Sequence, residues 1–421
     1  MLKRFKVLAI LLTVMLMFGL LVVGCGQKEE PQQGKDAGDE NITLRFAHWR
    51  GEDNAAFNDI IAQFNAEYPN ITVEQDISGS EQYQTKLQAE LQAQAGPDIM
   101  TVMPGARFAN LADADVYINL ANAEFIDRFS AHLLEPGQWK GQQLAIPYQL
   151  VFNMPVYNAG MFEEFGLEPA DSWEGFLALC EEIKSRGVTP IIFDSEIGPG
   201  QFINPMLMNN MPEGDTLSKV QLGEAKLTDE WFVKTLSQFD ELNKKGYFQR
   251  DVLGTRKDGA AALFAQEQGA MLAQGSYMMA SNKAANPELK QGLLAPITVP
   301  ADQMKYEGIH TATFMLGVNK NSTNQEAALK FLEFLFRPEI AAQYAAATGQ
   351  MLTVNGVQYD SPELNAQTPW LTKNTLFQPR YTVTVSEVET AITTAVVDVI
   401  GGMAPADAAQ KAQEAVERAI N

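Results

Sequence analysis

FNDIIAQFNAEYPNITV, residues 57–73, is the stretch that decides the fold, because it joins a helix directly to a strand. Its large apolar side chains recur three or four residues apart, which is the spacing of one helix face: Phe57, Ile60, Ile61, Phe64 and Tyr68. Pro69-Asn70 then ends the helix. Ile71 and Val73 alternate with polar residues, so a strand with one buried face follows. Helix and strand in direct succession indicate an α/β fold.

The same order repeats on both sides of this stretch. Apolar patterns predict strands at 42–47, 99–103, 144–152 with a break at Pro147, 190–193, 269–273 and 315–318. They predict helices at 78–96, 162–165, 173–186, 231–245, 258–266, 324–336 and 386–421, the last interrupted at Gly401-Gly402. Alternating strands and helices predict parallel sheets with crossover helices. Ligands of such sheets bind beyond the carboxyl ends of the strands, here the loops 48–54, 103–107, 194–204 and 274–278.

Length and charge limit the possible functions. The chain has 421 residues, which is too many for one small core and typical of two lobes. Its net charge of −21 repels nucleic acid and anionic lipid, so neither is an expected partner.

Cysteine and histidine are both scarce. Cys180 shares an apolar helical face with Phe176 and Ile183, so we expect a buried thiol. Cys25 is the one other cysteine, and no disulfide is expected to hold the folded part. The three histidines lie far apart without metal-ligand spacing, so we predict no metal site and no cofactor.

The first 24 residues have the features of an export signal. Three basic residues among the first six precede an apolar run at 7–23, which ends at Gly24-Cys25. This resembles the bacterial lipobox, in which the cysteine is acylated and becomes the mature N-terminus; Val22 stands where leucine is usual. A transmembrane anchor is the alternative, but the run is at the lower length limit for spanning and no basic cluster follows it. We expect a lipoprotein held on the outer face of the cell membrane through Cys25.

Residues 25–40 have almost nothing to bury. Such a composition predicts a flexible tether. A random coil of this length reaches roughly 20 Å on average. The folded part is therefore expected to stay close to the membrane.

An ordered set of motifs resembles the extracellular solute-binding proteins of carbohydrate ABC importers, the family that includes the maltose-binding protein. The motifs span essentially all of residues 41–421: His48-Trp49, the 57–73 stretch, Gly96-Pro97-Asp98-Ile99, Ile146-Pro147-Tyr148, Tyr157-Asn158, Met161-Phe162, Gly166-Leu167, Trp173-Glu174-Gly175-Phe176, Gly269-Ala270-Met271, Gly275-Ser276-Tyr277, and Lys330 to Phe334 followed by Gly349. One departure is that Leu352-Thr353 occupy the region where the family usually has a proline after this glycine.

The resemblance implies a two-lobed, periplasmic-binding-protein-like α/β fold. Each lobe would be a sheet flanked by helices, and crossing hinge strands would join them around a cleft that closes on ligand. Mapped here, the first lobe takes 41–149 and 296–345, and the second takes 152–293 and 348–421. The resemblance also implies a monomer that binds a sugar, performs no chemistry and passes the sugar to the transmembrane subunits of an ABC permease.

A sugar needs aromatic rings against its C–H faces and polar groups around its hydroxyl rim. In the first lobe the candidates are Trp49, Arg50, Glu52, Asp53, Tyr83, Asp98 and Tyr148. Glu52 and Asp53 could equally serve as acids at a helix N-terminus. Tyr83 could be a core residue, and Asp98 could cap a turn; the resemblance favours Asp98 near the cleft.

In the second lobe and the late segments the candidates are Gln201, Phe202, Asn204, Tyr277, His310 and Arg380. Tyr277 follows Gly275-Ser276, which resembles the family's stacking platform, and small residues there let the backbone approach a ligand. The 201–204 segment could instead be only a surface loop.

The expected function is that of a membrane-tethered receptor for a sugar, with an oligosaccharide favoured. Another polar solute, such as a polyol or a glycerophosphodiester, is the alternative within binding proteins. A secreted glycosidase is the alternative from another class, although no acid/base pair has a recognisable spacing. A surface adhesion protein or a sensor that has kept the binding fold is a third possibility.

The lipobox resemblance makes a testable prediction about anchoring. Cys25→Ala should release the mature protein from the membrane, because one covalent lipid group and not a spanning helix holds it. Labelling cells with a fatty-acid analogue measures the acylation directly. Absence of label on the wild-type protein would contradict the lipoprotein assignment.

Overall fold

The computed structural model describes residues 41–420. The predicted signal, the lipidation site at Cys25 and the tether lie outside the described residues. Within residues 41–420, no helix is both long enough and apolar enough to cross a membrane.

The first sheet is built on the strands that flank the 57–73 stretch. β1 (Ile42–His48) pairs in parallel with β2 (Ile71–Ile77) and with β3 (Ile99–Val102). Between β1 and β2 lies α2 (Asn54–Glu67), whose apolar face is buried as its spacing predicts. The crossover after β2 is α3 (Ser80–Gln92), and α4 (Ala106–Asp113) follows β3. The opening stretch therefore forms the helix and strand that its pattern predicts.

Two longer strands complete this sheet, whose order is β12-β6-β11-β3-β1-β2, with β13 also on β11. β6 (Ile146–Phe152) and β11 (Gly308–Val318) run antiparallel, and β11 also pairs antiparallel with β3. The sheet is thus mixed and not parallel as the alternation of elements suggested. β6 also continues through Pro147, where β12 (Met351–Leu352) no longer pairs with it and the Thr353 hydroxyl donates to the Pro147 carbonyl oxygen at 2.6 Å instead.

The second sheet has the order β10-β7-β9-β8. Its strands are β7 (Val156–Asn158), β8 (Thr189–Ile192), β9 (Gly269–Leu272) and β10 (Gln291–Leu293). The helices around it are α6 (Ala159–Phe165), α7 (Trp173–Ser185), α8 (Gly198–Leu207), α10 (Glu230–Lys244), α11 (Lys257–Ala265), α16 (Ser386–Ile400) and α17 (Pro405–Ile420). Cys180 lies on α7 and is fully buried, as expected.

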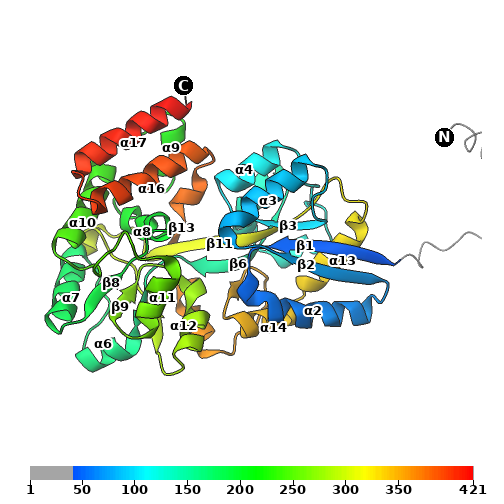
Figure 1. Cartoon of the computed structure of the whole chain (residues 1–421), viewed down its shortest axis with the longest axis horizontal. Coiled ribbons are helices and arrows are strands. Elements are labelled where there is room, and N and C mark those ends of the chain that lie inside the picture. Colours follow the sequence, from blue (N-terminus) through cyan, green and yellow to red (C-terminus); the bar gives the residue numbers. More distant parts are fainter. Residues whose placement is uncertain (1–40, 421) are drawn as a thin grey trace, which may run out of the picture. The chain divides into compact units, whose positions relative to one another are not determined.

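β11 links the two halves of the fold. Figure 1 shows it running from the region of α8 and β8 into the sheet that contains β1 and β3. β13 (Thr375–Phe377) and β12 come from the range assigned to the second lobe, yet they pair with β11 and β6 in the first sheet. The remaining elements are η1 (Gly51–Asp53), η2 (Ile126–Arg128), α5 (Ala131–Leu134), η3 (Glu135–Gly137), β4 (Gln138–Trp139), β5 (Gln142–Gln143), α9 (Thr216–Gln221), η4 (Ser276–Met278), α12 (Met279–Ala285), η5 (Ala301–Gln303), α13 (Gln325–Leu335), α14 (Pro338–Thr348), α15 (Pro362–Asn365), η6 (Thr368–Leu371) and η7 (Pro379–Thr382).

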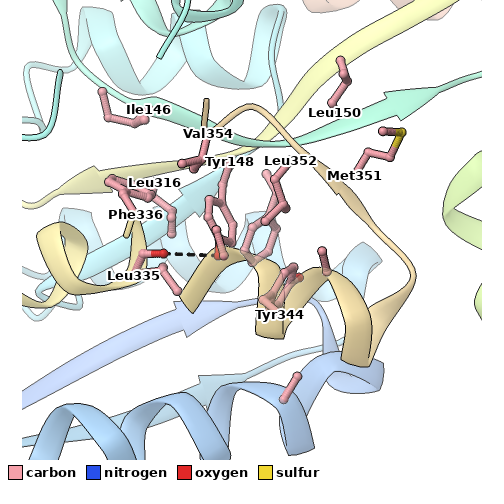
Figure 2. Packing of buried hydrophobic residues seen from close by; sticks show 14 of the residues in the cluster. Ile146, Tyr148, Leu150, Leu316, Leu335, Phe336, Tyr344, Met351, Leu352 and Val354 are labelled. Atoms are coloured by element: carbon pink, nitrogen blue, oxygen red, sulfur yellow. Dashed lines mark hydrogen bonds between the residues drawn. The ribbon is translucent and has the colours of Figure 1, made fainter. Parts of the chain in front are cut away.

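The larger core lies beneath β6 (Figure 2). Tyr148 is completely buried there, with its ring 5.2 Å from that of Tyr344 and 5.6 Å from that of Phe336. Its hydroxyl donates a hydrogen bond to the carbonyl oxygen of Leu335 at 3.4 Å. The structure therefore places Tyr148 in the core and not in the cleft, which corrects the sequence-based expectation.

Candidate functional site

A pocket of about 430 Å³ lies where the strands of both sheets end, a volume within the usual range for small-molecule sites. Residues from all four predicted loops line this central pocket, among them Trp49, Arg50, Glu52, Met103, Ile197, Gln201 and Tyr277. β6, Asn153 directly after it, and β11 supply another wall, with Gln149, Val151, Asn153, Thr311 and Thr313. Gly51, Ile77, Ser78, Gly79, Lys257 and Tyr381 complete it. The carboxyl ends of the strands thus converge on one cavity, as expected for α/β sheets.

Trp49 forms an aromatic wall on the side of the first sheet. Its ring packs edge-on against Tyr83 at 5.4 Å and against Phe314 at 5.1 Å. Phe314 has a left-handed backbone with φ of 49°, which is uncommon for a bulky residue. These contacts hold the indole in one orientation, so that it can present a surface to a ligand.

Tyr277 forms the aromatic wall on the other side. A Cβ at Gly275 would lie 2.8 Å from the Tyr277 ring and 2.7 Å from Asn153 Oδ1, so only glycine leaves room for this arrangement. The Tyr277 hydroxyl and the Gln201 Oε1 are buried and have no hydrogen-bond partner within the described residues. Burial raises the pKa of Tyr277 well above its ordinary value, which keeps the hydroxyl neutral and able to donate. Buried polar atoms are normally paired, so these two are suited to a polar ligand.

Gln378 holds two of the strand residues that line the pocket. Its side-chain oxygen accepts hydrogen bonds from Asn153 and, at 3.0 Å, from the Thr311 hydroxyl. The Gln378 Nε2 is buried without a partner in the described part of the chain. The pocket is therefore supported from behind by an amide that keeps a free donor.

Four further predicted site residues do not line the central pocket: Tyr83, Phe202 and Asn204 are buried, and Asp98 is half-buried. Tyr83 is 4 % exposed, and its hydroxyl lies 2.9 Å from the Thr101 carbonyl oxygen. Asp98 accepts hydrogen bonds from the Arg45 backbone N–H at 2.8 Å and from the Ser322 hydroxyl at 2.5 Å, which ties three segments together.

The other two come from α8. Phe202 packs edge-on against Phe239 at 5.6 Å in the second core. Asn204 donates to the Gly200 carbonyl oxygen at 2.7 Å and accepts from the Arg380 backbone N–H at 3.0 Å. α8 thus faces the pocket only through its first turn, and the structure corrects the expected placement of Phe202 and Asn204.

Three further predicted residues lie close to the central pocket without lining it. Asp53 is 3 % exposed and forms an ion pair with Arg50 at 2.7 Å. Arg380 is paired with Glu389 and precedes Tyr381, which lines the pocket. His310 lines a different cavity of about 480 Å³, together with Trp139, Phe377 and Tyr381 among others.

The residues that the sequence did not single out follow from strand alternation. Successive side chains of a strand point to opposite faces. Because Gln149 lines the pocket, its neighbour Tyr148 must point into the core, and the expectation was one residue out of phase. The polar residues Gln149 and Asn153, within an otherwise apolar strand, were the signal that could have revealed this.

The groups that line the pocket are suited to binding a polar solute. Among the described residues that line it, Glu52 is the one carboxylate, whereas glycoside hydrolysis needs two flanking carboxyl groups. Residues 41–420 contain no cluster of three or more His, Cys, Asp or Glu that could hold a metal ion. The arrangement offers three aromatic side chains, amides, hydroxyls, one guanidinium and one ammonium group to a ligand.

Known proteins share both the sequence pattern and the fold. The family model described as bacterial extracellular solute-binding protein matches residues 49–342. The multiple sugar-binding protein of Streptococcus mutans is 21 % identical over 365 residues, covering 83 % of each chain. A chitin oligosaccharide binding protein aligns with a TM-score of 0.80 at 20 % identity, covering 91 % of this chain and 100 % of that one. The solute-binding protein RafE in complex with raffinose aligns with a TM-score of 0.77 at 18 % identity, covering 90 % of this chain and 100 % of RafE. These structures share the two-lobed fold.

His310 makes the stability of the fold depend on pH. Burial, reinforced by the neighbouring His132, lowers the pKa of His310 to about 4, and burial also lowers the pKa of His48. Between about pH 6.5 and 4 the unfolded chain therefore binds protons that the folded chain does not. This contribution to stability is complete above about pH 6.5 and is lost as the pH falls.

We expect a lower free energy of unfolding at pH 5 than at pH 7, measured by urea titration. His310→Gln should reduce this difference in the free energy of unfolding between the two pH values. His48 accounts for part of the difference that remains in the variant. His132→Gln removes an exposed imidazole and should change the difference less. An unchanged difference in His310→Gln would contradict this account.

Proposed function

Because the chain belongs to the family of bacterial extracellular solute-binding proteins, we propose that its central pocket binds a neutral oligosaccharide for an ABC importer. Its relatives include sugar-binding proteins and an sn-glycerol-3-phosphate-binding protein, and this chain is a receptor and not an enzyme. One observation carries the proposal: Trp49 and Tyr277 line the same pocket from different sheets, beside unpaired buried polar atoms.

The composition of the pocket matches the surface of a sugar. Aromatic rings favour the C–H faces of a pyranose, while amides and hydroxyls satisfy its hydroxyl rim. Gln149, Asn153, Gln201, Thr311 and Thr313 supply such groups. Relatives named for sugars and an aligned complex with raffinose support an oligosaccharide.

A polyol or a glycerophosphodiester is the alternative ligand class. A phosphodiester carries a charge that needs unpaired cations, yet Arg50 is already paired with Asp53. Lys257 is the other cation that lines the pocket, and the carboxylate of Glu52, 3.5 Å from Arg50, adds a second anion beside that guanidinium. The neutral sugar therefore ranks first.

We further propose that the protein acts outside the cytoplasmic membrane as a monomer and delivers its ligand to the permease subunits. An acylated Cys25 would keep it beside them. The lobes would divide as 41–149 with 296–345 and 152–293 with 348–421, except that β12 and β13 of the last range join the first sheet, and would close around the ligand.

A thermal-shift screen of residues 41–421 against neutral sugars tests the ligand class. A sugar at 100 times its Kd should add about 2.7 kcal/mol to the free energy of unfolding. The best sugar should then be recovered unchanged after prolonged incubation, because the protein only binds it. Cleaved product in proportion to the protein would instead establish a glycosidase.

The role of Tyr277 gives a sharper prediction. Losing an aromatic stacking contact and its apolar burial costs about 2–4 kcal/mol, so Tyr277→Ala should weaken sugar binding on the order of 30-fold or more. Tyr277→Phe keeps the ring, so it should cost much less if stacking dominates and nearly as much if the hydroxyl binds the sugar. Calorimetry measures both affinities. An unchanged affinity in Tyr277→Ala, or a large fall in its ligand-free melting temperature, would mean that Tyr277 is a packing residue.

A further inference from the structure

Arg50 and Asp53 form a buried ion pair at the edge of the central pocket. Arg50 donates through Nε to Asp53 Oδ2 at 2.7 Å and through Nη2 to Oδ1 at 3.2 Å. The two side chains are 8 % and 3 % exposed. A buried charge is costly unless it is paired. This two-point contact therefore neutralises Arg50 where it lines the pocket, and the exposed Glu52, 3.5 Å from Arg50 Nε, is a second and weaker partner.

Tyr344 connects the Arg50–Asp53 ion pair to Gln149 on the opposite wall of the pocket. Its hydroxyl donates a hydrogen bond to Asp53 and accepts one from Gln149 Nε2, the latter at 2.7 Å. Tyr344 is fully buried on α14, outside the pocket, whereas Arg50 and Gln149 both line it. One hydroxyl thus fixes two of the polar groups that a ligand would meet.

The charges around the pocket balance. The lining residues carry two cations, Arg50 and Lys257, and one anion, Glu52; Asp53 behind them supplies the second anion. Burial alone lowers the pKa of Arg50, but the charge of Asp53 and the neighbouring Tyr344 outweigh it and raise that pKa, so the guanidinium stays charged. An anionic ligand would have to compete with Asp53 for this cation, whereas a neutral ligand needs only its N–H groups.

We propose that Asp53 sets the charge selectivity of the pocket, and that Tyr344 positions Asp53 and Gln149 for this task. Asp53 cancels the attraction of Arg50 for anions and leaves it as a hydrogen-bond donor to neutral solutes. The proposal rests on the proposed function, because it concerns the same pocket, and it names the class of ligand rejected: sugars that carry a carboxylate or a phosphate. Mismatched charges across an interface are an effective way to exclude wrong partners.

Asp53→Asn tests the charge, because it preserves the shape of the side chain and removes its anion. We expect this variant to bind galacturonate at least about tenfold more tightly than the wild type does, with a gain that shrinks as salt screens the new charge. Calorimetry with galactose and galacturonate, which differ by one carboxylate, measures the change. Adding Arg50→Gln to the variant should abolish the gain.

Tyr344→Phe separates positioning from charge and serves if Asp53→Asn does not fold. It keeps the ion pair and frees Gln149, so affinity for the neutral sugar found in the screen should fall about tenfold, with no gain for galacturonate. Tyr359→Phe is the matched control, because the Tyr359 hydroxyl accepts a hydrogen bond from the Leu352 backbone N–H at 3.0 Å and lies outside the pocket lining. It should change neither affinity.

The outcomes distinguish the two proposals. Asp53→Asn that folds but gains no affinity for galacturonate overturns the selectivity role, whatever neutral sugars do. Tyr344→Phe with unchanged neutral-sugar affinity overturns the positioning role. A wild-type protein that binds no neutral sugar would refute the proposed function, while the gain of anion binding in Asp53→Asn would still support the role of Asp53.

Discussion

The antiparallel pairing of β6 with β11 is the constraint on which the rest of the structure depends. These strands are neighbours in the first sheet, and Gln149 and Val151 of β6 together with Thr311 and Thr313 of β11 line the central pocket. The strand register and the alternation of side chains together determine which residues face the pocket. Gln149 and Thr313 are register partners and both face the central pocket, so Tyr148 must face the core. A slip of one residue would exchange the polar pocket wall for tyrosine and leucine. Core and pocket are therefore specified by the same ladder of hydrogen bonds.

Polarity in the interior is arranged in two different ways around this ladder. On the side of the first sheet, the buried charges of Arg50 and Asp53 are satisfied by each other, and Tyr344 completes the network. On the other side, Tyr277, Gln201 and Gln378 keep buried atoms without partners in the described residues. A paired network is rigid and presents fixed donors, whereas unpaired atoms gain most from a polar ligand. One wall of the pocket therefore has hydrogen-bonding groups that the protein already holds in place. The other wall has polar atoms that can form hydrogen bonds with a bound solute.

The fold was predictable from sequence because its units are local. The 57–73 stretch has a helical period followed by a strand period, and both elements form with the expected face buried. The sheet's mixed direction was not predictable, because β11 enters it from a segment far along the chain. The rule that ligands bind beyond strand ends identified five residues that line the pocket in the structure: Trp49, Arg50, Glu52, Gln201 and Tyr277. The same rule failed for four other residues near strand ends or in these loops, because their side chains pack in the core or form hydrogen bonds with the backbone: Tyr83, Asp98, Phe202 and Asn204.

The sequence by itself determined the α/β class, the family and the loops that meet at the site, because periodicity and motif order are properties of neighbouring residues. Only the tertiary structure decided which side chain of each loop reaches the cavity. Asp53 shows why: its position after β1 suits a ligand contact, a helix N-terminus or an ion pair equally well. The choice is made by Arg50 beside it and by Tyr344, 291 residues further along the chain. Such a contact depends on how distant elements pack, and no local pattern encodes it.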